Sequence, residues 1–257
     1  MIVDSHCHLI HNKNTLSIEE IINNAKSNDV TRLLNISTNQ DDFDKCIKLS
    51  EMYEDVYTSI GIHPHESNQM NNKIYKKILK LSSHKKVIGI GETGLDYFYN
   101  HSKKSLQKDS FVQHIKLSQV TDLPLIIHMR DAEEDMLEII EREYEKKAFS
   151  GVIHCFTGSF KFAQRLLKIG FFFSISGIIT FKNSNVLRET VPKIPISKIF
   201  IETDSPYLSP DPVRGAVNQP ANILHTLECI SKLYNVNVDS FKDISSCNFF
   251  NLFKKAN

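Results

Sequence analysis

Short, continuously apolar runs alternate with longer amphipathic segments along most of the chain. An apolar run rich in β-branched side chains is typical of a strand buried on both faces, whereas an apolar period of about 3.6 residues is typical of a helix packed on one side. The pattern predicts eight strands, at Ile2–His6, Arg32–Ser37, Val56–Ile62, Val87–Glu92, Leu125–His128, Gly151–His154, Phe171–Ile175 and Lys198–Glu202. It predicts a helix after each of the first seven strands and two more after the eighth, at Ser17–Ser27, Gln40–Tyr53, Lys73–Ser82, Ser105–Thr121, Ala132–Tyr144, Phe160–Ile169, Ser184–Val191, Ala221–Tyr234 and Val238–Lys255.

Eight strands that alternate with helices predict an α/β fold, a (β/α)8 barrel, with residues 1–257 forming a single domain. The two C-terminal helices follow a Pro-rich loop, Ser205–Pro220, and are expected to pack outside the barrel. A doubly wound open sheet is the alternative. The two folds differ in one respect that matters below, because the first and last strands are neighbours only in a closed barrel.

Composition limits the partners of the chain. Lys and Arg number 31 against 30 Asp and Glu, so any nucleic-acid contact must come from a local patch or from bound metals. The five cysteines form no C-x-x-C pair, which is typical of free thiols in a reducing compartment. The N-terminus lacks a secretory pattern, and the longest apolar stretch, Phe171 to Phe181, is too short for a bilayer. We therefore expect a cytoplasmic monomer with no membrane contact and no obligatory protein partner.

Candidate chemistry begins in the first strand, where His6 and His8 flank Cys7. A strand period of two turns both imidazoles to one face and Cys7 to the other. Paired neutral imidazoles suit a divalent transition metal. The alternative for either histidine taken alone is an ordinary buried core residue.

Four more potential ligands end later apolar runs, namely Glu92, His128, His154 and Asp204. At roughly 25–35 residues per β/α unit, their spacing places them at strands 4, 5, 6 and 8. Barrel active sites lie at the carboxyl ends of the strands, and in a closed barrel strand 8 adjoins strand 1. A single metal centre is therefore predicted from all six residues.

The six residues divide naturally between two ions. We expect His6, His8, Glu92 and Asp204 on one ion and Glu92, His128 and His154 on the other, because a carboxylate with two oxygens can bridge two cations. Glycines 91 and 94 allow the close backbone approach that this position needs. Such mixed ligands suit hydrolysis with Zn²⁺, Mn²⁺ or Mg²⁺. The alternatives are a core or loop role for the histidines, a buried salt bridge for Glu92 and a turn for Asp204.

Further candidates lie around the metal centre. His63, which follows the third strand in the sequence Gly61-Ile-His-Pro-His65, is predicted to bind substrate or carry a proton, and Glu202 to orient a ligand or water. Arg130 and Arg214 are candidates for pairing with an anionic substrate. An ordinary structural or surface role is the alternative for each. The histidines outside these motifs, among them His114, are expected to be solvated.

Six sequence blocks together resemble the TatD family of metal-dependent deoxyribonucleases. They follow the family order over nearly the whole chain and read Asp4-Ser-His-Cys-His-Leu9, Gly61-Ile-His-Pro-His65, Ile90-Gly-Glu-Thr-Gly-Leu-Asp-Tyr97, Pro124-Leu-Ile-Ile-His-Met-Arg-Asp-Ala132, Val152-Ile-His-Cys-Phe-Thr-Gly-Ser159 and Ile201-Glu-Thr-Asp-Ser-Pro-Tyr-Leu208. The resemblance implies a TIM barrel, two divalent ions, and metal ligands at the six positions named above. One departure is Gln219, where the family usually has Glu; it removes a charge beside the site's loop.

The resemblance also implies a reaction. It implies phosphodiester hydrolysis of DNA, often as a 3′-to-5′ exonuclease, in which a metal-activated water attacks phosphorus and Asp204 accepts its proton. RNA as a substrate stays open. The alternatives are an amide or ester hydrolase of the amidohydrolase type, a D-aminoacyl-tRNA deacylase on the same site, and a non-catalytic barrel with a structural metal.

Overall fold

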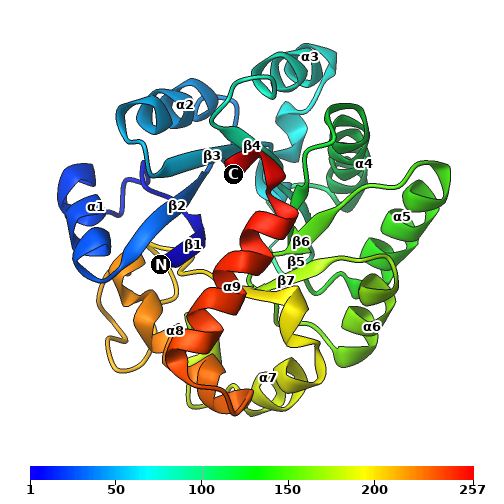
Figure 1. Cartoon of the computed structure of the whole chain (residues 1–257). Coiled ribbons are helices and arrows are strands. Elements are labelled where there is room, and N and C mark those ends of the chain that lie inside the picture. Colours follow the sequence, from blue (N-terminus) through cyan, green and yellow to red (C-terminus); the bar gives the residue numbers. More distant parts are fainter. Residues whose placement is uncertain (100) are drawn as a thin grey trace.

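Eight parallel strands lie side by side in the order β1 to β8 in the computed structural model, which describes residues 1–99 and 101–257 (Figure 1). All eight predicted strands are present, although several ends differ; β4, for example, continues past Glu92 to Asp96. Their bounds are β1 Ile2–Cys7, β2 Val30–Ile36, β3 Val56–Ile60, β4 Val87–Asp96, β5 Leu125–Arg130, β6 Gly151–Ile153, β7 Phe172–Ile175 and β8 Ile199–Ile201.

The sheet closes where the chain leaving β8 pairs with β1. Cys7 and Ser205 form a parallel bridge. The amide of Asp204 donates to His6 O at 2.9 Å, and the amide of His8 donates to Ser205 O at 2.7 Å. The buried Asp4 carboxylate adds bonds from the amide and hydroxyl of Thr203, at 2.9 and 2.5 Å. The predicted barrel is confirmed, and the open sheet is excluded.

Within residues 1–99 and 101–257, nine α-helices accompany the strands. Helices α1 to α8 lie around the barrel wall (Figure 1). Each predicted helix is present, with ends that differ by a few residues. Their bounds are α1 Ile18–Ser27, α2 Phe43–Met52, α3 Asn72–Leu81, α4 Lys104–Thr121, α5 Glu133–Lys146, α6 Phe160–Lys168, α7 Asn185–Thr190, α8 Ile223–Leu233 and α9 Val238–Leu252. Among the described residues, no helix is both long and apolar enough to cross a bilayer.

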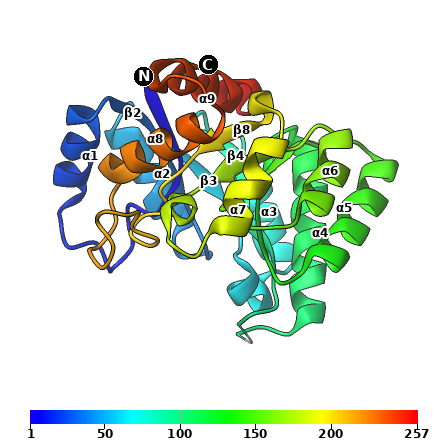
Figure 2. The same ribbon diagram turned by 90° about the horizontal axis from the view of Figure 1, so that it is seen from below.

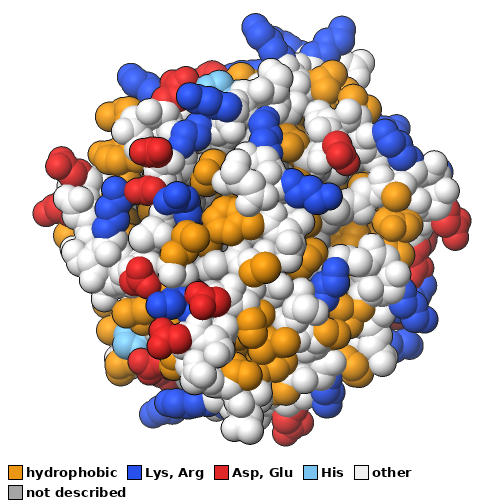
Figure 3. Space-filling model, in the orientation of Figure 1, with side chains coloured by type: hydrophobic (Ala, Val, Ile, Leu, Met, Phe, Trp, Pro, Cys, Tyr) orange, Lys and Arg blue, Asp and Glu red, His pale blue; other side chains and the backbone are white. Residues whose placement is uncertain are grey.

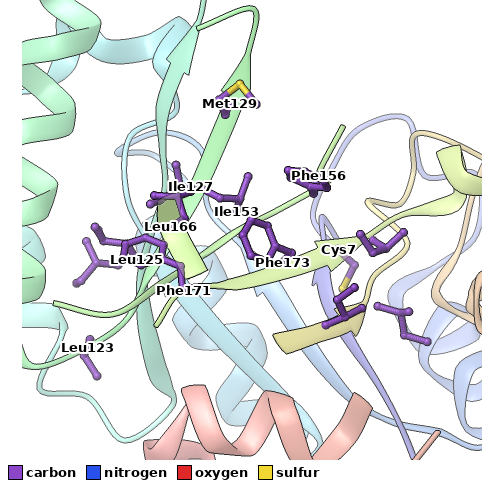
Figure 4. Packing of buried hydrophobic residues seen from close by; sticks show 14 of the residues in the cluster. Cys7, Leu123, Leu125, Ile127, Met129, Ile153, Phe156, Leu166, Phe171 and Phe173 are labelled. Carbon is purple, nitrogen blue, oxygen red and sulfur yellow. The ribbon is translucent and has the colours of Figure 1, made fainter. Parts of the chain in front are cut away.

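The main core lies between the strands and the surrounding helices. Leu125, Ile127, Ile153 and Phe173 project outward from the barrel wall and pack with Leu166 of α6 (Figure 4). All five side chains are almost fully buried. Burial of each contributes on the order of 1.5–3 kcal/mol, so this layer holds the strands that carry the candidate ligands.

Helix α9 lies outside the barrel, as predicted, but across its amino-terminal end and not along its wall (Figures 1 and 2). Phe249 of α9 and Phe253, directly after it, pack against inward-facing residues such as Phe200 and Ile126. Asn248 Nδ2 donates to Ile199 O at 2.7 Å, which anchors the helix to β8. This end of the barrel is therefore closed by apolar packing, and the carboxyl end is left for a site.

The face that α9 covers carries basic and acidic side chains interspersed with apolar ones (Figure 3). That mixture fits the formal net charge of +1. Any charge-driven substrate binding must therefore come from another part of the surface.

His114 was expected to be solvated, and that expectation is wrong. The ring extends from α4 toward the end of β3 and is fully buried there. Its Nε2 accepts a hydrogen bond from the amide of Ile62 at 3.0 Å. Its Nδ1 lies 2.7 Å from Ser110 O. Since Nε2 accepts, Nδ1 carries the proton and donates, so the neutral ring satisfies both contacts.

We expect acid to destabilise the fold through His114. Burial lowers its pKa to about 4, whereas an imidazole in an unfolded chain titrates near pH 6.5. As the pH falls from about 6.5 to about 4, the unfolded chain gains a proton that the folded ring does not accept, so the free energy of unfolding decreases. The difference between the two pKa values corresponds to about 3 kcal/mol.

Urea denaturation at pH 7 and pH 4.5 measures this effect in the wild type, in His114→Gln and in His225→Gln as a control on α8. Glutamine can donate and accept hydrogen bonds but does not titrate. Between the two pH values, His114→Gln should lose about 2–3 kcal/mol less stability than the wild type. Equal losses in the wild type and His114→Gln would contradict the assignment.

Candidate metal centre

Six predicted ligands converge at the carboxyl end of the barrel. His6 lies at the end of β1 and His8 directly after it. β4 carries Glu92, and β5 carries His128. His154 follows β6 directly, and Asp204 follows β8. Glu92, His6, His8 and His154 are buried, whereas Asp204 keeps some exposure, so the group lies at the floor of an open site.

The first part of the group surrounds one oxygen of Glu92. The Oε2 atom lies 3.4 Å from His6 Nε2 and 3.9 Å from His8 Nε2. Asp204 Oδ1 lies 3.4 Å from His8 Nε2 and 3.7 Å from His6 Nε2. This is the first of the two predicted ligand sets.

The second part surrounds the other oxygen of Glu92. The Oε1 atom lies 2.8 Å from His154 Nε2, 3.1 Å from His128 Nδ1 and 3.5 Å from His63 Nε2. His128 Nδ1 and His154 Nε2 are 3.3 Å apart. His63, expected to contact substrate or carry a proton, thus has a nitrogen within the second ligand set.

These donor atoms fit metal ions. Two ligands about 2.0–2.1 Å from a tetrahedral Zn²⁺ lie roughly 3.3 Å apart, close to the nitrogen–oxygen and nitrogen–nitrogen separations seen in both sets. Both ring nitrogens of His6 are buried and lack a hydrogen-bond partner among the described residues. An orphaned buried polar atom costs on the order of 1–3 kcal/mol, and a bound cation at Nε2 removes one such cost.

The electrostatics keep the carboxylates ionised. Burial alone raises the pKa of Glu92, but the nearby imidazoles of His154, His63 and His6 outweigh it and hold that pKa well below its usual value. Burial also raises the pKa of Asp204, but the bond from His8 and the charges of His6, His8 and His154 together outweigh it, so the pKa of Asp204 is lowered. Metal ligation requires deprotonated carboxylates, and both groups meet that condition.

Glu202 lies behind the second ligand set, as a ligand-orienting role requires. It is fully buried, its Oε1 lies 3.4 Å from His154 Nδ1, and its Oε2 accepts a 2.5 Å bond from Ser174 Oγ. His6, His154 and Glu202 also each place a ligand atom within 4.8 Å of one another. A carboxylate behind a ligating imidazole selects the tautomer and holds the ring in place.

Asp96 has the same relation to His128, and sequence reasoning missed it. Its Oδ2 lies 2.9 Å from His128 Nε2 and 3.2 Å from His65 Nε2. The strand predicted from the sequence stopped at Glu92, whereas β4 continues to Asp96. Had the strand been continued, its period of two would have placed Glu92, position 94 and Asp96 on one face.

The glycines of β4 permit this crowding. Gly94 has a φ of +138°, and a Cβ atom there would lie 2.0 Å from His128 O. At Gly91, with a φ of +146°, a Cβ would lie 2.6 Å from Ile126 O. The close approach expected from the sequence is confirmed, and it brings Glu92 alongside His128.

Two residues of the loop after β8 lie away from the centre. Arg214 was predicted to bind substrate, but its guanidinium stacks 3.8 Å above the ring of Phe181 and donates to Ser209 O at 3.1 Å. Gln219, the departure from the family pattern, accepts a 3.0 Å bond from Asn24 of α1. Of the described residues, neither Arg214 nor Gln219 lines the cavity over the centre.

A cavity of about 760 Å³ opens above the ligands. His63 and Arg130 line it, as their predicted substrate contacts require, together with Tyr99 and Tyr207. Its volume matches sites that take a small molecule or one end of a polymer. The centre is therefore reachable from solvent at the carboxyl end of the barrel.

Comparison with known proteins decides the family. The model of the family described as TatD related DNase matches residues 3–254. The chain belongs to this family. It is 42% identical to an uncharacterized metal-dependent hydrolase of Buchnera aphidicola subsp. Baizongia pistaciae, over 98% of this chain and 96% of the relative. It is 36% identical to the Bacillus subtilis uncharacterized metal-dependent hydrolase YabD, over 99% of both chains.

The fold of the chain is also similar to that of a solved structure. YJJV, a TATD homolog from Escherichia coli K12, superposes with a TM-score of 0.91 over 98% of both chains, at 24% identity. The resemblance read from the six blocks is thus confirmed. With its family, its relatives and its His and Glu clusters, the chain is a metal-dependent hydrolase.

Replacing Glu202 with Gln should weaken metal binding without unfolding the protein. The amide keeps the size of the side chain but removes the charge beside His154 Nδ1, and such changes lower metal affinity by about 10- to 100-fold. Competition between the metal-free protein and a chromophoric Zn²⁺ chelator measures the affinity. Ser174→Ala, which removes the hydroxyl that donates to Glu202 and contacts Ser5 but keeps the Glu202 charge, should have a smaller effect. An unchanged affinity in Glu202→Gln would show that the carboxylate does not act through His154.

Proposed function

We propose that this TatD-family chain hydrolyses the phosphodiester bonds of DNA, as a 3′-to-5′ exonuclease, with two divalent ions that Glu92 and the surrounding histidines would hold. The observation that carries the proposal is the arrangement of the two Glu92 oxygens, each facing its own set of imidazoles beneath an open cavity. The description of the matched family as TatD related DNase supports the choice of substrate. Two cations a few ångströms apart suit an in-line displacement at phosphorus.

The residues of the centre would share the work as follows. His6, His8 and Asp204 would hold one ion, His128, His154 and His63 the other, and Glu92 both. When bound, the ions neutralise charge on the phosphate and make a water molecule more acidic; Mg²⁺, Mn²⁺ and Zn²⁺ all provide this chemistry.

Asp204 is the proposed proton acceptor. Its side chain is 14% exposed, the largest exposure in the first ligand set, and it lines the cavity. It orients the attacking water toward phosphorus and takes up the proton that the water loses. His63, 14% exposed on the opposite side of Glu92, would help to hold the second ion.

Arg130 is the proposed contact for the substrate's phosphates. Its side chain is exposed at the cavity rim, and among the described residues it forms no ion pair with a carboxylate. A planar guanidinium with free donors suits bidentate pairing with a phosphate. Location in the cytoplasm and a monomeric state remain predictions from the sequence.

Asp204→Asn should lower the rate of DNA hydrolysis about 1,000-fold, because loss of a general base typically costs 100- to 10,000-fold. The backbone at Asp204 has a φ of +55°, a conformation that Asn tolerates as well as Asp does, so the variant should stay folded. Metal-stripped protein refilled with Mg²⁺, Mn²⁺ or Zn²⁺ is assayed on single-stranded DNA labelled at the 3′ or the 5′ end.

Early release of the 3′ label, dependent on metal and lost in the variant, is the expected result. A wild-type rate in Asp204→Asn would remove that residue from the mechanism. Parallel assays on RNA, on an amide, an ester and a lactone, and on D-aminoacyl-tRNA test the other substrate classes. Cleavage of one of these without cleavage of DNA would replace the nuclease proposal.

A further inference from the structure

Two aromatic side chains stand exposed on the turn just after β4. Phe98 is 54% exposed and Tyr99 is 41% exposed. Among the described residues they are the only aromatic members of the strongly exposed large hydrophobic side chains, whereas ten phenylalanines are fully buried. Tyr99 lines the cavity that leads to the ligands. Neither Phe98 nor Tyr99 belongs to the hydrophobic core of the described residues.

A cation and a further ring extend this surface. The guanidinium of Arg130 lies 4.0 Å from the centre of the Phe98 ring and 5.0 Å from that of Tyr99. The exposed His101 ring also stacks, with an offset, against Tyr99, with centroids 5.6 Å apart and an angle of 20°. The rim therefore presents flat π surfaces beside a positive charge.

Asp96 ties this surface to the metal centre. Its Oδ1 accepts hydrogen bonds from the amides of Phe98 and Tyr99, at 3.1 and 2.9 Å. Its Oδ2 faces His128 Nε2 at 2.9 Å. One buried carboxylate thus positions both a candidate metal ligand and the turn that carries the aromatic pair, and their separation is set by the fold.

We propose that Tyr99, supported by Phe98 and Arg130, is a stacking subsite for a nucleobase of single-stranded nucleic acid next to the scissile phosphate. The subsite rests on the proposed nuclease function. Aromatic rings and arginine planes stack with every base, because every base has a π face. The subsite therefore accepts all four bases, requires a base free of its duplex stack, and leaves the Arg130 donors for the adjoining phosphate.

The test compares Tyr99→Leu, which keeps apolar bulk but loses the ring, with Tyr99→Phe, which keeps the ring. On single-stranded DNA, Tyr99→Leu should raise KM about tenfold with little change in kcat, since stacking on one aromatic contributes on the order of 1–3 kcal/mol. Tyr99→Phe should retain the wild-type KM. Tyr144→Leu, on α5 and outside the cavity lining, is the matched control.

Substrates with an abasic nucleotide at each of the last positions in turn identify the stacked base. At one position the abasic nucleotide should raise the KM of the wild type about tenfold. The KM of Tyr99→Leu should be the same for that abasic substrate as for intact DNA. An unchanged KM in Tyr99→Leu, or equal losses on intact and abasic DNA, would overturn the subsite.

Binding separates failure of the subsite from failure of the nuclease proposal. Anisotropy of dye-labelled DNA measures Kd for Asp204→Asn with and without Tyr99→Leu. Weaker binding through Tyr99→Leu, even if the wild type cleaves no nucleic acid, would support the subsite and overturn only the proposed reaction. Equal Kd values would overturn the subsite whatever the enzyme cleaves. Metal content equal to that of the wild type would exclude an indirect effect through Asp96 and His128.

Discussion

The carboxylate of Glu92 is the interaction on which the rest of the site depends. A buried anion is stable only when it is paired, and here imidazoles surround both of its oxygens. The pairing requires β4 to lie against β5 at Gly91 and Gly94, where any Cβ atom would overlap the neighbouring backbone. The requirement for a paired buried charge therefore explains the glycines of β4.

The two ends of the barrel are packed in different ways. At the amino-terminal end, α9 and the residue after it cover the inner side chains with Phe249 and Phe253, and the packing there is apolar (Figure 2). At the carboxyl end, polar contacts replace apolar packing; Asp4 binds Thr203, and Glu202 binds Ser174. Burial raises the pKa of Asp4 to about 7, so its bonds to Thr203 only partly offset its desolvation. The candidate ligands therefore lie among polar contacts at the carboxyl end, beneath an open cavity.

The candidate ligands and the exposed aromatic pair lie on different segments, and Asp96 contacts both. The candidate ligands lie on strands or directly after them, where the backbone is held by the sheet. The exposed aromatic pair lies on the turn beyond β4, where a polymer can reach it. Asp96 joins the two, since it binds the turn amides with one oxygen and faces His128 with the other. Such coupling would keep the proposed base contacts at a fixed distance from the candidate metal centre.

The sequence by itself determined the number and order of strands and helices, because the apolar runs alternate in a way that only a β/α repeat satisfies. It also indicated which residues meet, since each candidate ligand ends a run and barrel strands all end on one side. The sequence did not show where each helix packs, because that depends on contacts between residues far apart along the chain. Helix α9 crosses the barrel end because the inner side chains there need cover, and no local periodicity encodes which surface a helix covers.

The same reason explains the individual errors. His114 looked like a surface residue within an amphipathic helix, but an unpaired amide at Ile62 required an acceptor. Arg214 looked free to bind an anion, but Phe181 offered it a stacking partner in the folded chain. Asp96 needed the full length of β4, which depends on pairing with β5 as far as Arg130. Residue type and spacing could predict the centre, whereas the partners of single side chains depended on the tertiary structure, because those partners lie far away in sequence.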